Sequence, residues 1–363
     1  MDNPDTLQKI ISQNVHRLAG KRVTLGFDGF VDAVFKVIRQ KDQQGTFYFE
    51  SVAEFGKYTV EKGAGNFSLE LEELTTKLGG NMPIMANALA RLGTDVSCIG
   101  AMGKSSLHPV FKPLSEKASL HSFADPGLTT AMEFKDGKIL LAQMANLNKV
   151  DWSTIKGTID IDLLVKLFTH RDLIGILNWS ELDHSTSMWK GLLDDILPKT
   201  IASANKPVGF FDLSDCSKRS EAIILEMLDL LKAFSKYWRV VLSLNLNETS
   251  VVYKALTGNS FQLPHIESIG EKLIQRLEVD TLLIHHSKQA LAFSEKGIFK
   301  MNSTIIENPM LSTGAGDNFN AGFCAGMLIE TDLQSSLGLG HAVANYYMQT
   351  GMSPTCTDLA VGN

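Results

Sequence analysis

The chain has 363 residues, 44% of them hydrophobic, and its 34 basic and 40 acidic side chains give a net charge of -6. A chain of this size can bury about three quarters of its unfolded surface without disulfides or metal ions. It lacks the basic runs that bind nucleic acids or anionic membranes, and no apolar stretch reaches the roughly 20 residues that cross a bilayer. The four cysteines are widely spaced and no signal-peptide pattern is visible, so we expect a cytoplasmic protein.

Short apolar runs alternate with helical patterns along most of the chain. A helix is predicted over residues 7–18, ending near Gly20. Buried strands are predicted at 23–27, 96–101, 173–177, 208–213, 240–244 and 281–284. Strands that alternate with helices favour parallel crossovers, and hence an α/β fold with a doubly wound, mostly parallel sheet flanked by helices.

Two regions, about 31–52 and 119–144, break this alternation and read as strands without helices. A few strands are not stable alone, so we expect a small antiparallel β lid that emerges from one domain spanning residues 1–363. An exposed edge strand of this lid would pair with another copy, which predicts a homodimer through the lid.

The strongest chemical signal is the segment 311–323, LSTGAGDNFNAGF, in which two glycines precede a helix of small residues. Free N–H groups of Gly314, Ala315 and Gly316 at a helix N-terminus would attract a phosphate or a developing phosphoryl charge. Asp317 would repel a bound phosphate unless it accepts the proton of an attacking hydroxyl. A plain glycine-rich turn with a first-turn acid is the alternative.

This segment resembles the second signature of the ribokinase-like (PfkB) carbohydrate kinases, D-T-x-G-A-G-D-x-F. The segment 79–93, GGNMPIMANALARLG, is similar to the family's first signature. The resemblance covers nearly the whole chain. It implies a ribokinase-like fold and ATP-dependent phosphorylation of a sugar hydroxyl, with Asp317 as general base and Gly314 to Gly316 as the anion hole.

The sugar is expected to meet polar groups from the first half of the chain. Gly80 permits close backbone approach and Asn81 offers a donor and an acceptor to hydroxyls. Family members bind sugar hydroxyls through an Asp that leaves the first strand; we match this role to Asp32, while Asp28 is a second candidate or a turn cap. Lys104 would reach an anionic substrate group, or is a solvated helix-start lysine.

The nucleotide and its metal are expected at the other end of the site. Asn245-Leu246-Asn247-Glu248 resembles the family's N-x-x-E element, and Asn245 and Glu248 would serve Mg²⁺ through water, unless they only cap a helix. The resemblance implies that ATP also meets Ser287, Thr313, Gly314, Gly316 and His341. Asp212 and Asp215 read as caps and are left out of the site.

Two departures from the family pattern weaken the resemblance locally. Leu311 replaces an acid that serves a monovalent-cation site in relatives, which argues against activation by K⁺. Residues 284–290, IHHSKQA, lack both glycines of a loop that touches the nucleotide in relatives. A catalytically impaired sugar-binding regulatory protein, or a nucleoside or phosphosugar kinase, therefore stays open as an alternative.

Overall fold

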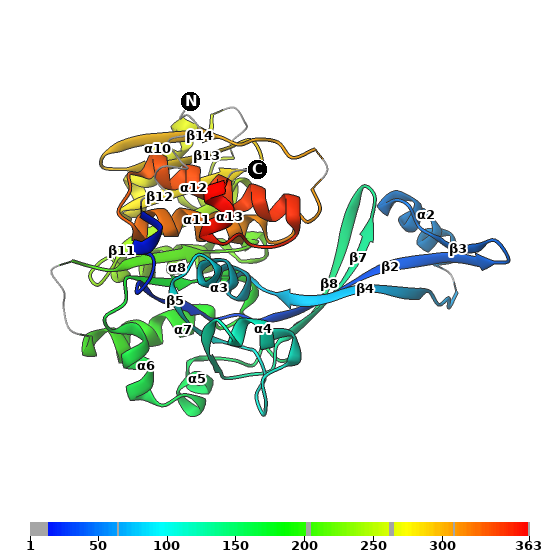
Figure 1. Cartoon of the computed structure of the whole chain (residues 1–363), viewed down its shortest axis with the longest axis horizontal. Coiled ribbons are helices and arrows are strands. Elements are labelled where there is room, and N and C mark those ends of the chain that lie inside the picture. The colour runs from blue at the N-terminus through cyan, green and yellow to red at the C-terminus, as the bar shows by residue number, and fades with distance from the viewer. Residues whose placement is uncertain (1–13, 64, 201–204, 261–264, 308, 362–363) are drawn as a thin grey trace.

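The computed structural model describes residues 14–63, 65–200, 205–260, 265–307 and 309–361 (Figure 1). The helix predicted over residues 7–18 lies mostly outside these ranges, and only a short 3₁₀ turn, Val15–Arg17, falls within them. Within the described ranges, no helix has both the length and the apolar character needed to cross a membrane.

Nine strands form one large sheet in the order β14-β13-β12-β11-β10-β9-β1-β5-β6. All neighbours from β6 to β12 are parallel, whereas β13 and β14 add an antiparallel hairpin at one edge. The predicted doubly wound α/β fold is confirmed. The strands are β1 Arg22–Gly26, β5 Asp95–Gly100, β6 Ala118–Ser122, β9 Leu173–Ile176, β10 Val208–Asp212, β11 Arg239–Asn245, β12 Thr281–His286, β13 Gln289–Ser294 and β14 Gly297–Asn302.

Helices cover both faces of this sheet and bury one apolar cluster on each. On one face, α3, α11 and α12 pack against residues such as Leu25 and Val96. On the other face, α5 to α10 pack against residues such as Ile174 and Leu242. The helices are α2 Val52–Lys62, α3 Asn81–Arg91, α4 Lys112–Ser115, α5 Trp152–Thr158, α6 Ile161–Phe168, α7 Ser185–Gly191, α8 Glu221–Phe234, α9 Leu246–Thr257, α10 Ile266–Leu277, α11 Ala315–Leu328, α12 Leu333–Thr350 and α13 Cys356–Val361.

A second sheet of five strands, the lid, projects from the main body, with α2 beside its far end (Figure 1). Its strands are β2 Phe30–Asp42, β3 Gly45–Tyr48, β4 Glu70–Gly79, β7 Gly127–Phe134 and β8 Gly137–Gln143. All its pairs are antiparallel except β2 with β7. The predicted ranges differ in two ways: β4 was not expected, and 118–122 belongs to the large sheet as β6 rather than to the lid.

The base of the lid brings polar side chains into one row across three strands. Asp32 of β2 lies opposite Lys77 of β4 on one side and opposite Thr129 of β7 on the other. Directly opposite residues share a face of the sheet, so these three side chains point the same way. The lid therefore begins as one wall of a cavity.

Candidate active site

Polar residues of the main body gather where the parallel strands end. Asp28 follows β1, Asn178 follows β9, and Asp212, Asn245 and His285 lie at the ends of β10, β11 and β12. These strands are neighbours with the same direction, so their carboxyl ends meet at one edge of the sheet. Ligands of doubly wound sheets bind at this edge.

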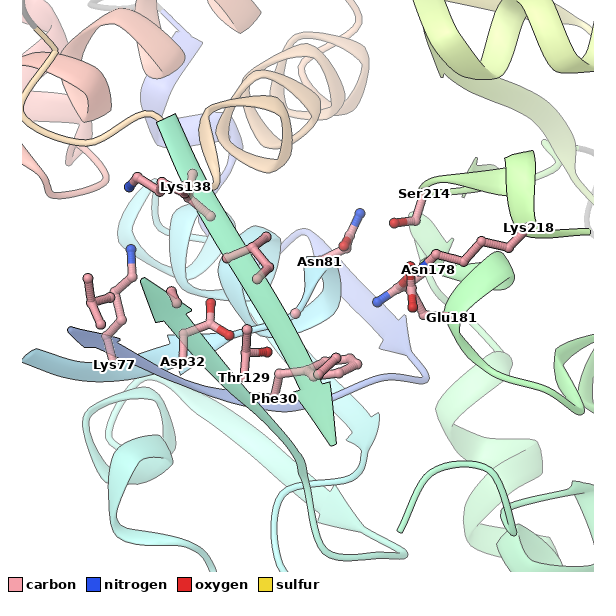
Figure 2. A pocket seen from close by; sticks show the side chains of 16 residues that line it. Phe30, Asp32, Lys77, Asn81, Thr129, Lys138, Asn178, Glu181, Ser214 and Lys218 are labelled. Carbon is pink, nitrogen blue, oxygen red and sulfur yellow. Dashed lines mark hydrogen bonds and ion pairs between the residues drawn. The ribbon is translucent and has the colours of Figure 1, made fainter. Parts of the chain in front are cut away.

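A first cavity of about 260 Å³ lies between the base of the lid and this edge. Figure 2 shows Asp32, Lys77 and Thr129 on the lid side, and Asn178, Glu181, Ser214 and Lys218 facing them from the main body, with Asn81 between the two groups. The predicted sugar-binding residues Asp32, Gly80 and Asn81 all line it.

Asn81 is held from two sides by buried carboxylates. Its backbone N–H donates to Asp28 Oδ2 at 2.8 Å, and its side-chain Nδ2 donates to Asp212 Oδ1 at 2.9 Å. The amide group is therefore fixed in orientation. One of its N–H bonds is already used, which leaves less donor capacity for a ligand than the sequence suggests.

Asp28 is fully buried and does not line the cavity. It also accepts hydrogen bonds from the Met82 N–H at 2.9 Å and from Asn178 Nδ2 at 2.7 Å. Burial raises the pKa of Asp28 to about 7, although these hydrogen bonds lower it. Of the two roles left open for Asp28, the structure places it in the turn-holding one.

The turn before α3 leaves room for these carboxylates only because it has no side chains. Gly80 has φ +90, and a Cβ there would lie 2.6 Å from Asp28 Oδ2. A Cβ at Gly79 would lie 2.3 Å from the Asp32 carboxyl carbon. The paired glycines therefore let two carboxylates approach one turn.

The charges around the first cavity are largely balanced. Burial raises the pKa of Asp32, and the Thr129 hydroxyl and the Lys77 charge lower it. Lys218 Nζ lies 2.6 Å from Glu181 Oε1, and Lys138 Nζ lies 3.1 Å from Glu133 Oε1. Each lysine that lines the cavity therefore has a carboxylate near it. None of these lysines was expected from the sequence.

Lys104 is not brought to this cavity. Its side chain is exposed and its backbone N–H donates to Asp125 Oδ1 at 2.8 Å. It is not among the residues that line the cavity. Of the second interpretation, a solvated helix-start lysine, the exposure matches, but Lys104 lies in a loop, and the next helical turn begins only at Pro109.

A second cavity of about 650 Å³ lies on the other side of the α11 N-terminus. Asn245, Ser287, Gly316 and His341 line it, as expected for the nucleotide side, whereas Thr313 lines the first cavity instead. The Phe319 ring lies between two histidines in this cavity, with centroids 5.1 Å from His285 and 5.0 Å from His341. Burial lowers the pKa of both histidines to about 4, so both are neutral at physiological pH.

The turn between the two cavities begins α11. Gly314 has φ +96 and its neighbour Thr313 is fixed by the Tyr347 hydroxyl, which donates to the Thr313 carbonyl at 2.7 Å. The Ala315 N–H donates to the Ser312 carbonyl at 3.1 Å. Ala315 is therefore already paired, and an anion would meet the N–H groups of Gly314 and Gly316.

Asp317 follows this turn in the first turn of α11 and is partly buried. Burial raises its pKa well above the ordinary value, and the charges of Asp212, Asp28 and Glu248 raise it further. A carboxylate with a raised pKa is a stronger base than an ordinary one. Two of these charges, Asp28 and Asp212, belong to the carboxylates that hold Asn81, so Asp317 lies within the range of their electric field.

Asn245 and Glu248 form a capping box at the start of α9. The Glu248 N–H donates to Asn245 Oδ1 at 3.0 Å, and the Asn245 N–H donates to Glu248 Oε2 at 2.9 Å. Asn245 lines the second cavity and Glu248 does not. Burial, together with the Asp212 charge, raises the pKa of Glu248 to about 9. The capping role that the sequence left open is present.

Asp212, which the sequence analysis left out of the site, lies at this edge of the sheet and binds Asn81. It is 6% exposed and accepts hydrogen bonds from Asn81 Nδ2, from Asn320 Nδ2 at 2.9 Å and from the Ser214 N–H at 3.1 Å. Both aspartates accept from the N–H two residues further on, but Asp215 caps the 3₁₀ turn Cys216–Lys218, whereas Asp212 also binds the two distant amides. The sequence could have separated the two aspartates by their position, because Asp212 is the last residue of a parallel strand and Asp215 lies in the following turn.

The chain is similar to known proteins over nearly its whole length. A Haloferax volcanii ketohexokinase is 27% identical over 350 residues, which cover 94% of this chain and 91% of that protein. The structures of a Methanocaldococcus jannaschii nucleoside kinase (16% identity, TM-score 0.62) and a Thermotoga maritima ribokinase (14%, 0.63) share the fold. Each comparison covers 94% of this chain, with 98% and 99% of the other chains.

The model of the prokaryotic ketohexokinase family matches residues 3–361, nearly the entire chain. Together with the ribokinase fold and the two cavities that meet at the α11 turn, this match establishes a sugar-phosphorylating kinase. The chain belongs to the prokaryotic ketohexokinase family.

Proposed function

We propose that the protein transfers the γ-phosphoryl group of ATP to a hydroxyl of a free ketohexose. The observation that supports this most directly is the turn 313–316, which lines the first cavity through Thr313 and the second through Ala315 and Gly316. A sugar in the first cavity and a nucleotide in the second would meet at this turn, directly before Asp317.

The lining of the first cavity favours a neutral polyol. Asp32, Thr129 and Asn81 supply side-chain oxygens and an amide that suit hydroxyl groups. Because Lys77, Lys138 and Lys218 each lie near a carboxylate, the cavity has little uncompensated positive charge that could bind the phosphate of a phosphosugar. Similarity to a ketohexokinase further favours a ketohexose over a nucleoside.

Asp317 is proposed as the general base of the transfer. As the sugar oxygen bonds to the γ-phosphorus, its proton passes to the Asp317 carboxylate, and the bond to the oxygen bridging the β- and γ-phosphates breaks to release ADP. The N–H groups of Gly314 and Gly316, at the positive end of α11, would stabilise the charge on the transferring group. Closure of the lid would exclude water.

The proposed magnesium site has donors of suitable chemistry. Among the described residues, no three His, Cys, Asp or Glu side chains are grouped so that they could hold a metal ion. Asn245 lines the second cavity, and the side chains of Asn245 and Glu248 are engaged with each other in the capping box, so both would hold Mg²⁺ through water. The ion would neutralise charge on the triphosphate when bound with it.

Adenine is expected beside the His341 and Phe319 rings, with Ser287 at the mouth of the same cavity. Leu311 offers no carboxylate to a monovalent cation. We therefore expect the same turnover in K⁺ as in choline buffers.

The deciding experiment is an ADP-release assay over ketohexoses, aldoses, keto-acids, phosphosugars and nucleosides, with the Asp317→Asn variant run in parallel. We expect turnover with a ketohexose, and at least about a hundredfold lower kcat in the variant, the low end for loss of a positioned base. Sugar affinity measured by calorimetry should stay nearly unchanged. Asp162→Asn, which removes an exposed first-turn acid from α6, is the control.

Two results would refute parts of the proposal. Equal kcat in the Asp317→Asn variant and the parent would remove Asp317 from the role of base. Sugar binding without ADP release across the panel would favour the alternative of a sugar-binding regulatory protein.

A further inference from the structure

A buried chain of hydrogen bonds joins the sugar side of the site to the helix that carries Asp317. It runs from Asn81 Nδ2 to Asp212, from Asp212 to Asn320 Nδ2, and from Asn320 Oδ1 to the Ser243 hydroxyl, with contacts of 2.9 Å throughout. Asp212, Asn320 and Ser243 are nearly inaccessible to solvent. The chain thus links α3, β10, α11 and β11.

Asp212 is the centre of this chain because each carboxylate oxygen has its own amide partner. Oδ1 accepts from Asn81 and Oδ2 accepts from Asn320, three residues after Asp317 on the same helix. A buried carboxylate costs free energy unless its hydrogen bonds are satisfied, so this geometry is strongly constrained. Ser214 N–H completes the set.

We propose that Asp212 is a positioning residue for phosphoryl transfer, whose carboxylate fixes the sugar-binding turn at Asn81 relative to helix α11 and its base. This inference rests on the proposed function of the site. Asp212 lines neither cavity, and it would act through Asn81 and Asn320. Small displacements of reacting groups are costly: about 1 Å of misplacement lowers rates roughly a hundredfold.

The charge of Asp212 gives a second readout. It raises the pKa of Asp317, together with Asp28 and Glu248, after burial itself; burial and the Asp317 charge likewise raise the pKa of the Tyr347 hydroxyl. Asp212→Asn removes one of these negative charges. The pKa of Asp317 should fall, and the acid limb of the kcat/KM profile should move to lower pH.

The test compares Asp212→Asn and Asn320→Ser with the parent enzyme. We expect both variants to lower kcat/KM for the sugar about tenfold or more and to weaken sugar binding in calorimetry, with KM for ATP changed less than about twofold. Only Asp212→Asn should shift the acid limb. Asp215→Asn is the control, because it removes the same charge from the same loop. Asp215 is not among the charges that raise the pKa of Asp317, so the acid limb of this variant should match that of the parent.

Several outcomes would overturn the proposal. One is parental kinetics and sugar affinity in a cooperatively folded Asp212→Asn variant. If that variant does not fold, parental behaviour of Asn320→Ser decides against it. A loss of kcat as large as in Asp317→Asn, with no acid limb left, would make Asp212 the base instead. Calorimetry does not require turnover, so it tests the Asp212 link even if Asp317→Asn refutes the proposed mechanism.

Discussion

At the residue scale, three aspartates of this site have different surroundings and therefore different expected roles. Asp28 is surrounded by three N–H donors and holds a turn, whereas Asp32 faces the first cavity. Asp317 lies at a helix start among other carboxylates. The residue types and spacing identified Asn81 and Asp317 as candidates, and the family resemblance favoured Asp32 over Asp28 as a sugar-binding residue. Asp28 lies in the turn after β1, whereas Asp32 lies on β2, where pairing with β4 and β7 sets the direction of its side chain.

The bond from Tyr347 to Thr313 predicts a kinetic effect from a hydroxyl outside the reaction. Tyr347→Phe keeps the buried ring and removes the donor to the Thr313 carbonyl. A neutral hydrogen bond contributes about 1 kcal/mol, so we expect kcat to fall about fivefold with little change in KM for the sugar. Steady-state kinetics test this. Tyr346→Phe removes a hydroxyl that bonds Asp358 instead, and it should behave as the parent.

At the element scale, the strands of the large sheet were predictable and β4 was not. The former are continuous apolar runs because both of their faces are covered. In contrast, β4 has the sequence ELEELTTKLG and is mostly exposed, so it shows no apolar alternation. Its extended form comes from pairing with β2, a contact between residues far apart in sequence. The missing strand also explains why Lys77 was not predicted at the site.

The glycines at the two ends of α3 allow the cost of backbone strain to be measured separately from the cost of a clash with a neighbouring side chain. Gly80 and Gly93 have nearly equal φ, +90 and +98, but only Gly80 has a carboxylate in the space of a Cβ. Gly93→Ala should therefore cost about 1 to 2 kcal/mol of unfolding free energy, the backbone cost alone. Gly80→Ala should lower the free energy of unfolding by more than this, because its Cβ would also clash with Asp28, and it should raise KM for the sugar.

Denaturant unfolding and steady-state kinetics measure the two effects of these alanine substitutions. Equal losses of stability in both variants, with unchanged KM, would show that Asp28 can move away from the turn without consequence.

At the scale of the whole molecule, the lid presents apolar side chains on the face opposite the sugar. Thr129 and Ala131 line the first cavity, so the alternating residues Leu128 and Thr130 point away from it, and Leu141 pairs with Thr130. Leu128 is 40% exposed and Leu141 is 53% exposed. Because β8 is also an edge strand, we propose that this face meets a second copy of the chain.

Light scattering after size exclusion tests the proposed homodimer. We expect the parent to have twice the mass of one chain, and Leu141→Glu to be monomeric at the same concentration because the charge would be buried at the interface. Ile223→Glu, which charges an exposed apolar position on α8, should leave the mass unchanged. A monomeric parent would discard the dimer.

Strand β2 carries a consequence for how such a dimer would work. Its thirteen residues extend from Phe30, in the wall of the first cavity, to Asp42, where β2 turns into β3 at the far end of the lid (Figure 1). A partner that packs on Leu128 would restrain Val31, its neighbour in the inner half of this strand, beside the cavity. Thermodynamic reciprocity then requires that sugar strengthens self-association by the same factor by which self-association strengthens sugar binding. Dilution below the dissociation constant of the pair should weaken apparent sugar affinity.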